Sequence, residues 1–224
     1  MGSFLRYRDA YHPDWVVRAY EVAPPAFAKL LQEELAWLGR FLACPLVEVG
    51  CGGGRILVAL PLPPGLVVGV DLVLRYLAFA RRRRLRVHWV VGDGLHLPLA
   101  RGCWRTVIFA QATLGSLGEE TIRQEMVTSL ASLTAPGGSL LVTAYGPGAR
   151  QAREQWYRAQ QAEGLLPPFD EAATSGGTFA FQNGFVSREL SVHELQVLRP
   201  KGFLGEVNVL PSGLLTARWV KPVS

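Results

Sequence analysis

The chain has 224 residues, 49% of them hydrophobic, and a formal net charge of +5. This length suits one sizeable domain with a subdomain and is short for two independent domains. The hydrophobic fraction excludes intrinsic disorder, and the mild positive excess fits a solvated surface better than a dedicated nucleic-acid-binding face.

The cysteines and the N-terminal segment bear on the compartment. Cys44, Cys51 and Cys103 are an odd number without a closely spaced pair, so we expect neither a disulfide framework nor a metal site. The N-terminal segment is interrupted by charges and lacks the apolar stretch of a signal peptide. The longest uncharged segment, residues 126–149, contains turn residues that a membrane span would lack. We expect a cytoplasmic protein without a membrane partner.

A helical leader opens the chain. Its first twenty residues contain five aromatic side chains that stand out, namely Phe4, Tyr7, Tyr11, Trp15 and Tyr20. In residues 24–42, leucines then recur at helical spacing, and charged residues such as Glu34 occupy the other faces. This pattern predicts an amphipathic helix with Pro24 and Pro25 in its first turn.

Strand and helix patterns alternate over the next hundred residues. Strands are predicted at residues 46–49, 66–70, 86–91, 106–110 and 140–145. Helices are predicted between them at residues 55–60, 73–83 and 119–133. This alternation predicts a parallel sheet that is covered by helices on both faces.

The pattern changes in the last third of the chain. We predict a polar, solvent-facing helix at 149–163, a loop at 164–177 and strand character at 178–190. A short helix at 191–198 begins with a capping box formed by Ser191 and Glu194. Residues 204–210 and 214–220 then predict a closing pair of strands.

A glycine-rich turn, Glu48-Val49-Gly50-Cys51-Gly52-Gly53-Gly54, joins the first of these strands to a helix. Glycines allow a tight turn and a close approach of a ligand to the backbone. A dinucleotide-binding loop has a third glycine where this chain has Arg55, so the spacing favours a ligand without a pyrophosphate. Taken alone, the turn could equally be structural.

Two further acids end the next two strands. Asp71 could accept hydrogen bonds from a ribose diol, and Asp93 could accept one from an exocyclic amine such as that of adenine. With Glu48, they lie at the carboxyl ends of strands, where open α/β sheets bind ligands. Any one of them is more typical of a turn or a helix cap, but their joint register with the glycine loop indicates a cofactor site.

With these motifs, the sequence resembles the class I S-adenosylmethionine-dependent methyltransferase family. The resemblance covers about residues 45–145 and rests on the glycine loop, the end of the second strand at Asp71, the segment 92–99 and the turn at 136–138. It implies an α/β fold with a Rossmann-like, doubly wound, seven-stranded sheet. That sheet would be mostly parallel, with an antiparallel C-terminal hairpin.

The resemblance also implies S-adenosylmethionine (SAM) as the cofactor. Glu48 would orient the glycine loop and counter the cationic ligand, Asp71 would hold the ribose hydroxyls, and Leu72 and Asp93 would contact the adenine. Gln111, after the fourth strand, would face the cofactor or the substrate. The predicted cofactor-binding residues are Glu48, Gly50, Cys51, Gly52, Gly54, Asp71, Leu72, Asp93, Gly94 and Gln111.

We expect a single methyltransferase domain over residues 1–224. Within it, residues 1–42 form the helical leader or lid, and residues 43–146 form the cofactor-binding core. Residues 147–190 form an insertion, and residues 191–224 form the C-terminal helix and strand pair. The aromatic content of the leader and the insertion suggests that both close over the substrate, although it is also typical of ordinary core packing.

The expected function is methyl transfer to a small-molecule acceptor by in-line displacement, which needs mainly alignment and exclusion of water. A side-chain base is required only if the acceptor must lose a proton. Tyr145, at the end of the fifth strand, is a better candidate than His12, His96 or His193. Residues 109–113 lack the proline-rich motif of amino-group methyltransferases that act on DNA bases or glutamine.

Three alternatives remain open from the sequence. An RNA methyltransferase is supported by the basic balance and by the arginines in residues 81–86. A SAM-binding protein without catalysis would have the same motifs. A nicotinamide-dependent oxidoreductase is disfavoured by Arg55 at the third-glycine position. The sequence does not identify the acceptor or the oligomeric state.

Overall fold

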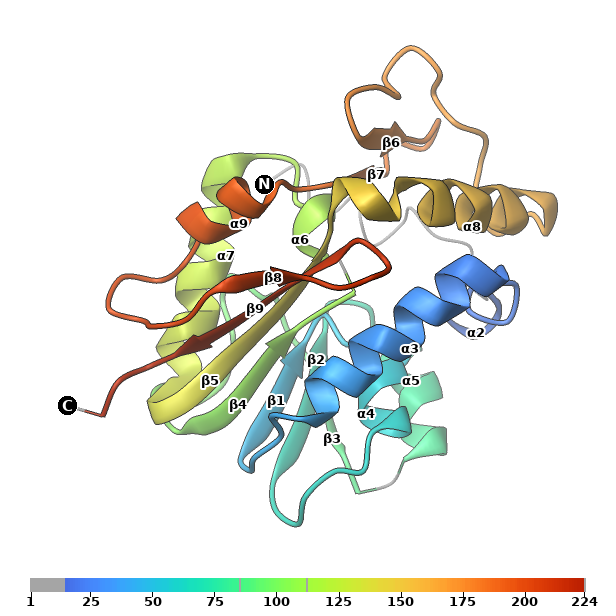
Figure 1. The fold of residues 1–224 in the computed structure, drawn as a ribbon. Helices are drawn as coiled ribbons and strands as arrows, with labels where there is room; N and C mark the ends of the chain where they lie inside the picture. Colours follow the sequence, from blue (N-terminus) through green and yellow to red (C-terminus); the bar gives the residue numbers. More distant parts are fainter. Residues whose placement is uncertain (1–14, 85, 112, 224) are drawn as a thin grey trace.

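The computed structural model describes residues 15–84, 86–111 and 113–223. Its centre is a seven-stranded sheet of order β3-β2-β1-β4-β5-β9-β8 (Figure 1). The first five strands are parallel to one another, β9 pairs with β5 in antiparallel direction, and β8 pairs with β9 in antiparallel direction. The predicted α/β fold with an antiparallel ending is confirmed. The strands are β1 (Leu46–Val49), β2 (Val67–Asp71), β3 (His88–Val91), β4 (Trp104–Phe109), β5 (Thr134–Tyr145), β8 (Val207–Val209) and β9 (Leu214–Val220).

The apolar runs of the central strands explain their position. Every residue of β1 and β2 is buried, as expected for strands covered on both faces. Their register pairs Val49 with Val70, so both strands end at the same edge of the sheet. The glycine loop and Asp71 therefore emerge side by side at this carboxyl edge.

Helices cover both faces of the sheet (Figure 1). The face that carries α3 packs Leu38 and Ile56 onto Leu46 and Ile108. The opposite face is covered by α7 and α9 and contains the largest apolar cluster, which includes Val127. The helices are α2 (Trp15–Arg18), α3 (Pro25–Gly39), α4 (Arg55–Ala59), α5 (Leu74–Arg83), α6 (Thr113–Ser116), α7 (Glu120–Leu133), α8 (Arg150–Ala162) and α9 (Val192–Val197), with a 3-10 turn η1 (Pro147–Ala149).

The insertion forms a cap near the carboxyl edge, built from α8 and a separate two-stranded hairpin of β6 (Thr178–Ala180) and β7 (Val186–Arg188) (Figure 1). The strand character expected at 178–190 is thus found as two short strands. The chain turns between the two short strands, where Gly184 has a φ of 82° and the Asn183 side chain accepts a hydrogen bond from the amide of Phe185.

The cap approaches the domain closely at α6. A side-chain carbon on Gly115 would lie 2.2 Å from the carbonyl oxygen of Arg188 in β7. A glycine is therefore required for this contact between hairpin and domain.

Helix α8 is not the solvent-facing helix that its polar composition predicted. Its buried residues, Arg153, Trp156, Tyr157 and Gln160, follow helical spacing and form one inner face. Two of the four are polar, so the hydrophobic pattern of this face was weak in the sequence. The face joins an aromatic cluster that includes Phe27 of α3.

Several boundaries also differ from the predicted ones. Strand β5 begins at Thr134, because the expected turn at 136–138 is an irregular part of the strand in which Gly137 donates its amide hydrogen to the carbonyl of Lys221. Strand β8 is confined to Val207–Val209. The short helices α2 and α6 were not predicted, since four residues give no readable period.

The amphipathic pattern of α3 placed Glu34 on an exposed face, and this prediction is wrong. Its side chain is fully buried and forms an ion pair with Arg55 at the start of α4. Its Oε1 also accepts hydrogen bonds from the Thr143 hydroxyl (2.5 Å) and the amide of Gln111 (2.9 Å). One carboxylate therefore connects α3, α4, β5 and the loop after β4.

Replacing Glu34 with Ala should reduce the free energy of unfolding by about 3 kcal/mol, because it leaves the Arg55 guanidinium and the Thr143 hydroxyl without their buried acceptor. Urea denaturation measures the loss. The matched control is Gln32→Ala, an exposed position on the same helix, which should change stability by less than about 0.5 kcal/mol. Equal stability of the two variants would contradict the structural role given to Glu34.

Candidate functional site

Two adjoining pockets lie at the carboxyl edge of the sheet. The strand-end pocket is lined by Leu72, Asp93, Gly94 and Met126, among others. The aromatic pocket lies beneath the leader and the cap and is lined by residues that include Trp15, Tyr20, Trp156, Tyr157 and Phe185. Residues that line both pockets are Gly50, Asp71, Thr113 and Ser116.

The glycine loop forms the boundary between the pockets. Gly50, Gly52 and Gly54 all have positive φ angles, of 71°, 52° and 73°. The loop therefore needs glycine at these alternate positions, because residues with a side chain rarely adopt this conformation. At Gly54, a side-chain carbon would also lie 2.5 Å from the Trp89 ring of β3. The last glycine of the motif is thus required by packing as well as by the turn.

Asp71 anchors this loop. Its Oδ2 accepts a hydrogen bond from the amide of Gly52 (2.7 Å), and its Oδ1 accepts one from the amide of Val73 (2.9 Å). Burial raises the pKa of the carboxyl group, and these backbone donors oppose the change. Each oxygen retains a lone pair, so the carboxylate can hold the loop and accept from a ligand's hydroxyls.

Glu48 lies at the base of the aromatic pocket and is 3% exposed. Burial raises the pKa of its carboxyl group to about 8; Arg55 opposes this rise, while Glu34 and Asp71 add to it. Its Oε2 has no hydrogen-bond partner among the described residues. A buried carboxyl with a free oxygen fits a ligand that carries a positive charge, as SAM does.

The predicted adenine-binding residues gather in the strand-end pocket. Asp93 caps its own turn, since its Oδ1 accepts from the amide of Leu95 (3.0 Å), but its side chain remains 35% exposed. Leu72 and Gly94 line the same pocket. Cys51 lies in the other pocket, where burial raises the pKa of its thiol well above the usual value.

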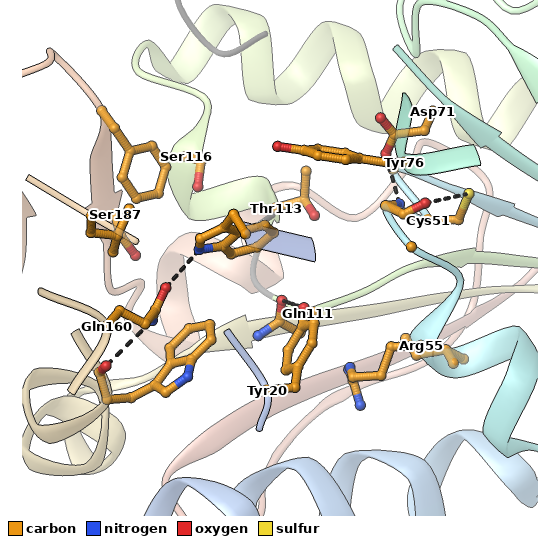
Figure 2. A pocket seen from close by; sticks show the side chains of 18 of the residues that line it. Tyr20, Cys51, Arg55, Asp71, Tyr76, Gln111, Thr113, Ser116, Gln160 and Ser187 are labelled. Carbon is orange, nitrogen blue, oxygen red and sulfur yellow. Dashed lines mark hydrogen bonds between the residues drawn. The ribbon is translucent and has the colours of Figure 1, made fainter. Parts of the chain in front are cut away.

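Gln111 is central to the aromatic pocket and has a φ of 52°, unusual for a residue with a side chain. Its Oε1 accepts a hydrogen bond from the Tyr20 hydroxyl (2.8 Å), and its Nε2 donates one to the Tyr145 hydroxyl (3.1 Å). Its backbone amide donates to Glu34 and Thr143. The amide side chain therefore connects the leader to the end of β5, and Figure 2 shows its contact with Tyr20.

The candidate bases differ in position. Tyr145 lines the aromatic pocket, but burial raises its pKa well above the usual value, and burial likewise raises the pKa of Tyr20 to about 12. Both hydroxyls keep their protons at neutral pH. His96 and His193 are exposed and line neither pocket. His12 lies outside the described residues.

The leader and the cap meet over the aromatic pocket. The indole of Trp15 donates to Gln160 Oε1 (2.6 Å), and that of Trp156 donates to the carbonyl of Ala19 (2.6 Å). Of the aromatic residues expected in a lid, Trp15, Tyr20, Trp156, Tyr157 and Phe185 line the pocket. Phe169, Phe179 and Phe181 pack in the cluster behind it, and Phe4, Tyr7 and Tyr11 lie outside the described residues.

Several pocket residues were not found from the sequence. Thr113 and Ser116 lie on α6, the helix that was not predicted, and Gln160 and Ser187 come from α8 and β7 of the cap. Arg55 was read only as a missing glycine, although it lines the pocket and pairs with Glu34. Their common signal was polarity inside otherwise buried segments, which a single sequence does not distinguish from surface polarity.

Comparison with known proteins gives a match to one family model. Residues 46–138 match the model of a methyltransferase domain, and this range contains the glycine loop, Asp71 and Asp93. No curated protein matches the chain in sequence.

Solved structures share the fold at low identity. A SAM-dependent methyltransferase from Methanosarcina mazei is 17% identical, with a TM-score of 0.59 over 84% of this chain and 98% of that one. A SAM-bound amino pentose methyltransferase from Micromonospora echinaspora is 19% identical, with a TM-score of 0.57 over 83% of this chain and 90% of that one. DhpI in complex with SAM and HEP is 21% identical, with a TM-score of 0.62 over 97% of both chains.

The family model and the fold agree with the arrangement of acids and glycines at the carboxyl edge. Residues 46–138 therefore form a methyltransferase domain, and together these findings support a class I S-adenosylmethionine-dependent methyltransferase, an enzyme that uses SAM as its cofactor.

Proposed function

We propose that this enzyme transfers a methyl group from SAM to a small-molecule acceptor by in-line displacement. The observation that carries the proposal is the aromatic pocket, which adjoins the strand-end pocket and lies beneath the leader and the cap. Such a compartment suits a molecule of limited size that is separated from water during the reaction.

The chain's own residues would hold SAM along the carboxyl edge. The adenosine part would occupy the strand-end pocket, with Asp71 toward the ribose hydroxyls, Leu72 on the adenine and Asp93 toward its amine. The amino-acid part would lie along the glycine loop above Glu48. SAM supplies the methyl group in activated form, so the protein's contribution is alignment and exclusion of water.

Tyr145 and Gln111 act, in this proposal, as hydrogen-bonding groups that position the acceptor. Tyr145 accepts a hydrogen bond from Gln111, and its raised pKa disfavours proton abstraction near neutral pH. Tyr20 and Trp15 of the leader cover the same compartment and keep water out.

An RNA acceptor is the weaker candidate. Arg81, Arg82 and Arg83 are exposed, but they end α5, which begins after the carboxyl end of β2 and precedes the amino end of β3. The arginine run therefore lies at the edge of the sheet opposite the pockets. Arg84 donates hydrogen bonds to the carbonyls of Val58 (2.9 Å) and Leu60 (3.3 Å).

In the described part of the chain, no helix has the length and apolarity to cross a bilayer.

Methyl transfer from labelled SAM to separate metabolite and RNA fractions tests the proposal directly. Label in the metabolite fraction supports it, and label confined to RNA would overturn the small-molecule acceptor. Calorimetry with SAM, S-adenosylhomocysteine and NAD provides the companion measurement. Tight SAM binding without label in any fraction would indicate a non-catalytic SAM-binding protein.

Binding of SAM at about pH 7 should release a proton from Glu48. The pKa of about 8 means that the free carboxyl is mostly protonated there, whereas a nearby positive charge favours its ionised form. Affinity should therefore rise as the pH approaches 8. Calorimetry in buffers of different ionisation enthalpy measures the number of protons released on binding. Glu48→Gln should abolish this release and weaken SAM binding roughly tenfold.

The same shift predicts the pH dependence of stability. Because the folded protein binds the Glu48 proton more tightly than the unfolded chain, this group stabilises the fold fully below pH about 4.5, and the contribution is lost as the pH rises through about 8. Ligand-free Glu48→Gln should lack this decline in urea denaturation. A decline of equal size in both proteins would argue against the assigned protonation.

Replacing Asp71 with Asn should weaken SAM binding by roughly tenfold to a hundredfold, because the charged acceptor for the ribose hydroxyls and the Gly52 amide is lost. Asp170→Asn is the matched control, since Asp170 caps a turn in the cap and lines neither pocket. Normal SAM affinity of Asp71→Asn would refute the ribose assignment.

Deletion of residues 1–20 should reduce cofactor affinity or turnover, because it removes the Trp15 and Tyr20 walls and exposes the aromatic pocket. Tyr20→Phe is the milder companion; it keeps the ring and removes only the hydrogen bond to Gln111. Its turnover should fall several-fold, to a value between those of the deletion and the full chain. Unchanged steady-state kinetics after the deletion would contradict the lid.

A further inference from the structure

One end of the aromatic pocket carries two hydroxyls with an unused hydrogen. Tyr157 donates to Ser187 Oγ (2.7 Å), and Arg153 Nη2 also donates to that oxygen (3.0 Å). Ser187 therefore accepts twice, and its own hydrogen has no acceptor among the described residues. If the bond between the two hydroxyls runs the other way, the spare hydrogen belongs to Tyr157. Either way, this hydroxyl pair offers one donor, and both residues line the pocket.

This donor lies away from the cofactor side. Figure 2 shows Ser187 and Gln160 on one side of the pocket and Asp71 and Cys51 on the other. Gln160 is partly engaged, since its Oε1 accepts from Trp15 and one of its two Nε2 hydrogens is donated to the carbonyl of Trp156. The hydroxyl pair is therefore the donor at this end that a buried cation contacts directly, and it is available for a ligand.

A buried cation, Arg153, contacts the hydroxyl pair. Arg153 is fully buried; its Nη2 also donates to the carbonyl of Ser187 (2.7 Å), and its Nε has no partner in the described part of the chain. Its counter-charge, Glu189, lies 3.4 Å from Nη1 and is 15% exposed. A guanidinium that donates to a hydroxyl makes that hydroxyl a stronger donor and favours a negatively charged acceptor.

The remaining walls at this end are apolar and mostly flat. They are formed by Trp15, Trp156, Leu166 and Phe185. The acidic residues that line the pocket, Glu48 and Asp71, belong to the glycine loop and the end of β2. The chemistry of this end thus combines a planar apolar space with a donor that is backed by positive charge.

We infer that the methyl acceptor is a small organic acid with a flat apolar body, whose carboxylate is held by the Tyr157–Ser187 hydroxyl pair in front of Arg153. The inference rests on the proposed function and extends it by naming the acceptor class. It also orients the acceptor: the carboxylate serves as an anchor, and the methylated atom lies toward the glycine loop.

The test uses three ring compounds of similar size that differ in charge. Binding of benzoate, benzamide and benzylamine to the full chain is measured by calorimetry with S-adenosylhomocysteine present. We expect benzoate to bind at least roughly tenfold more tightly than benzamide, and benzylamine to bind least. Equal or tighter binding of benzylamine, or no binding of any of the three while S-adenosylhomocysteine binds, would overturn the inference and leave the proposed function standing.

A double-mutant cycle assigns the effect to the hydroxyl pair. Tyr157→Phe and Ser187→Ala each leave one hydroxyl with a free hydrogen, so each should cost benzoate affinity only about threefold. The double variant removes both donors and should cost roughly tenfold or more, which brings benzoate to the level of benzamide. A double variant that binds benzoate like the wild type would overturn the inference.

Two controls separate this result from a folding defect. All variants should bind S-adenosylhomocysteine with unchanged affinity, because the substitutions lie away from the strand-end pocket. Ser212→Ala is the matched serine control; Ser212 lines neither pocket, and its substitution should leave benzoate binding unchanged. Failure of the wild type to bind S-adenosylhomocysteine would overturn the proposed function and this inference with it.

Discussion

The buried carboxylate of Glu34 is the constraint on which the arrangement of the site depends. It holds Arg55 at the first turn after the glycine loop and accepts from the amide of Gln111 after β4. Through these two partners, one side chain fixes both the cofactor loop and the residue that connects Tyr20 to Tyr145. A buried ion pair is costly to desolvate, and here additional hydrogen bonds to the same carboxylate offset that cost.

The sequence predicted the part of the fold that depends on local pattern. Strands β1 and β2 are short, mostly apolar and fully buried, and β4 ends in an apolar run, while Glu48, Asp71 and Asp93 stand at or next to strand ends. The strand-end pocket was therefore predictable, since parallel strands bring such residues to one edge. Each of the predicted cofactor-binding residues other than Gly54 lines at least one of the two pockets.

The aromatic pocket was less predictable because its residues acquire their roles only through tertiary contacts. Glu34 looked like a surface residue of α3, and the buried face of α8 looked polar, since Arg153 and Gln160 occupy half of it. Both cases have the same cause: a buried polar residue needs partners from distant segments, such as Thr143 for Glu34 or Ser187 for Arg153. A single sequence does not pair such positions.

The close contact at Gly115 has a consequence for how this enzyme could change its substrate. The hairpin that carries Ser187 is seated against α6 where a side chain is missing, and α6 also carries Thr113 and Ser116 of the shared wall. In the proposed arrangement, the distance between the acceptor end and the cofactor end thus depends on the size of one residue that binds neither molecule. A methyl group at that position would act as a spacer: it would lift the hairpin, and Ser187 with it, and so change the alignment of the two reactants without changing the identity of any binding residue.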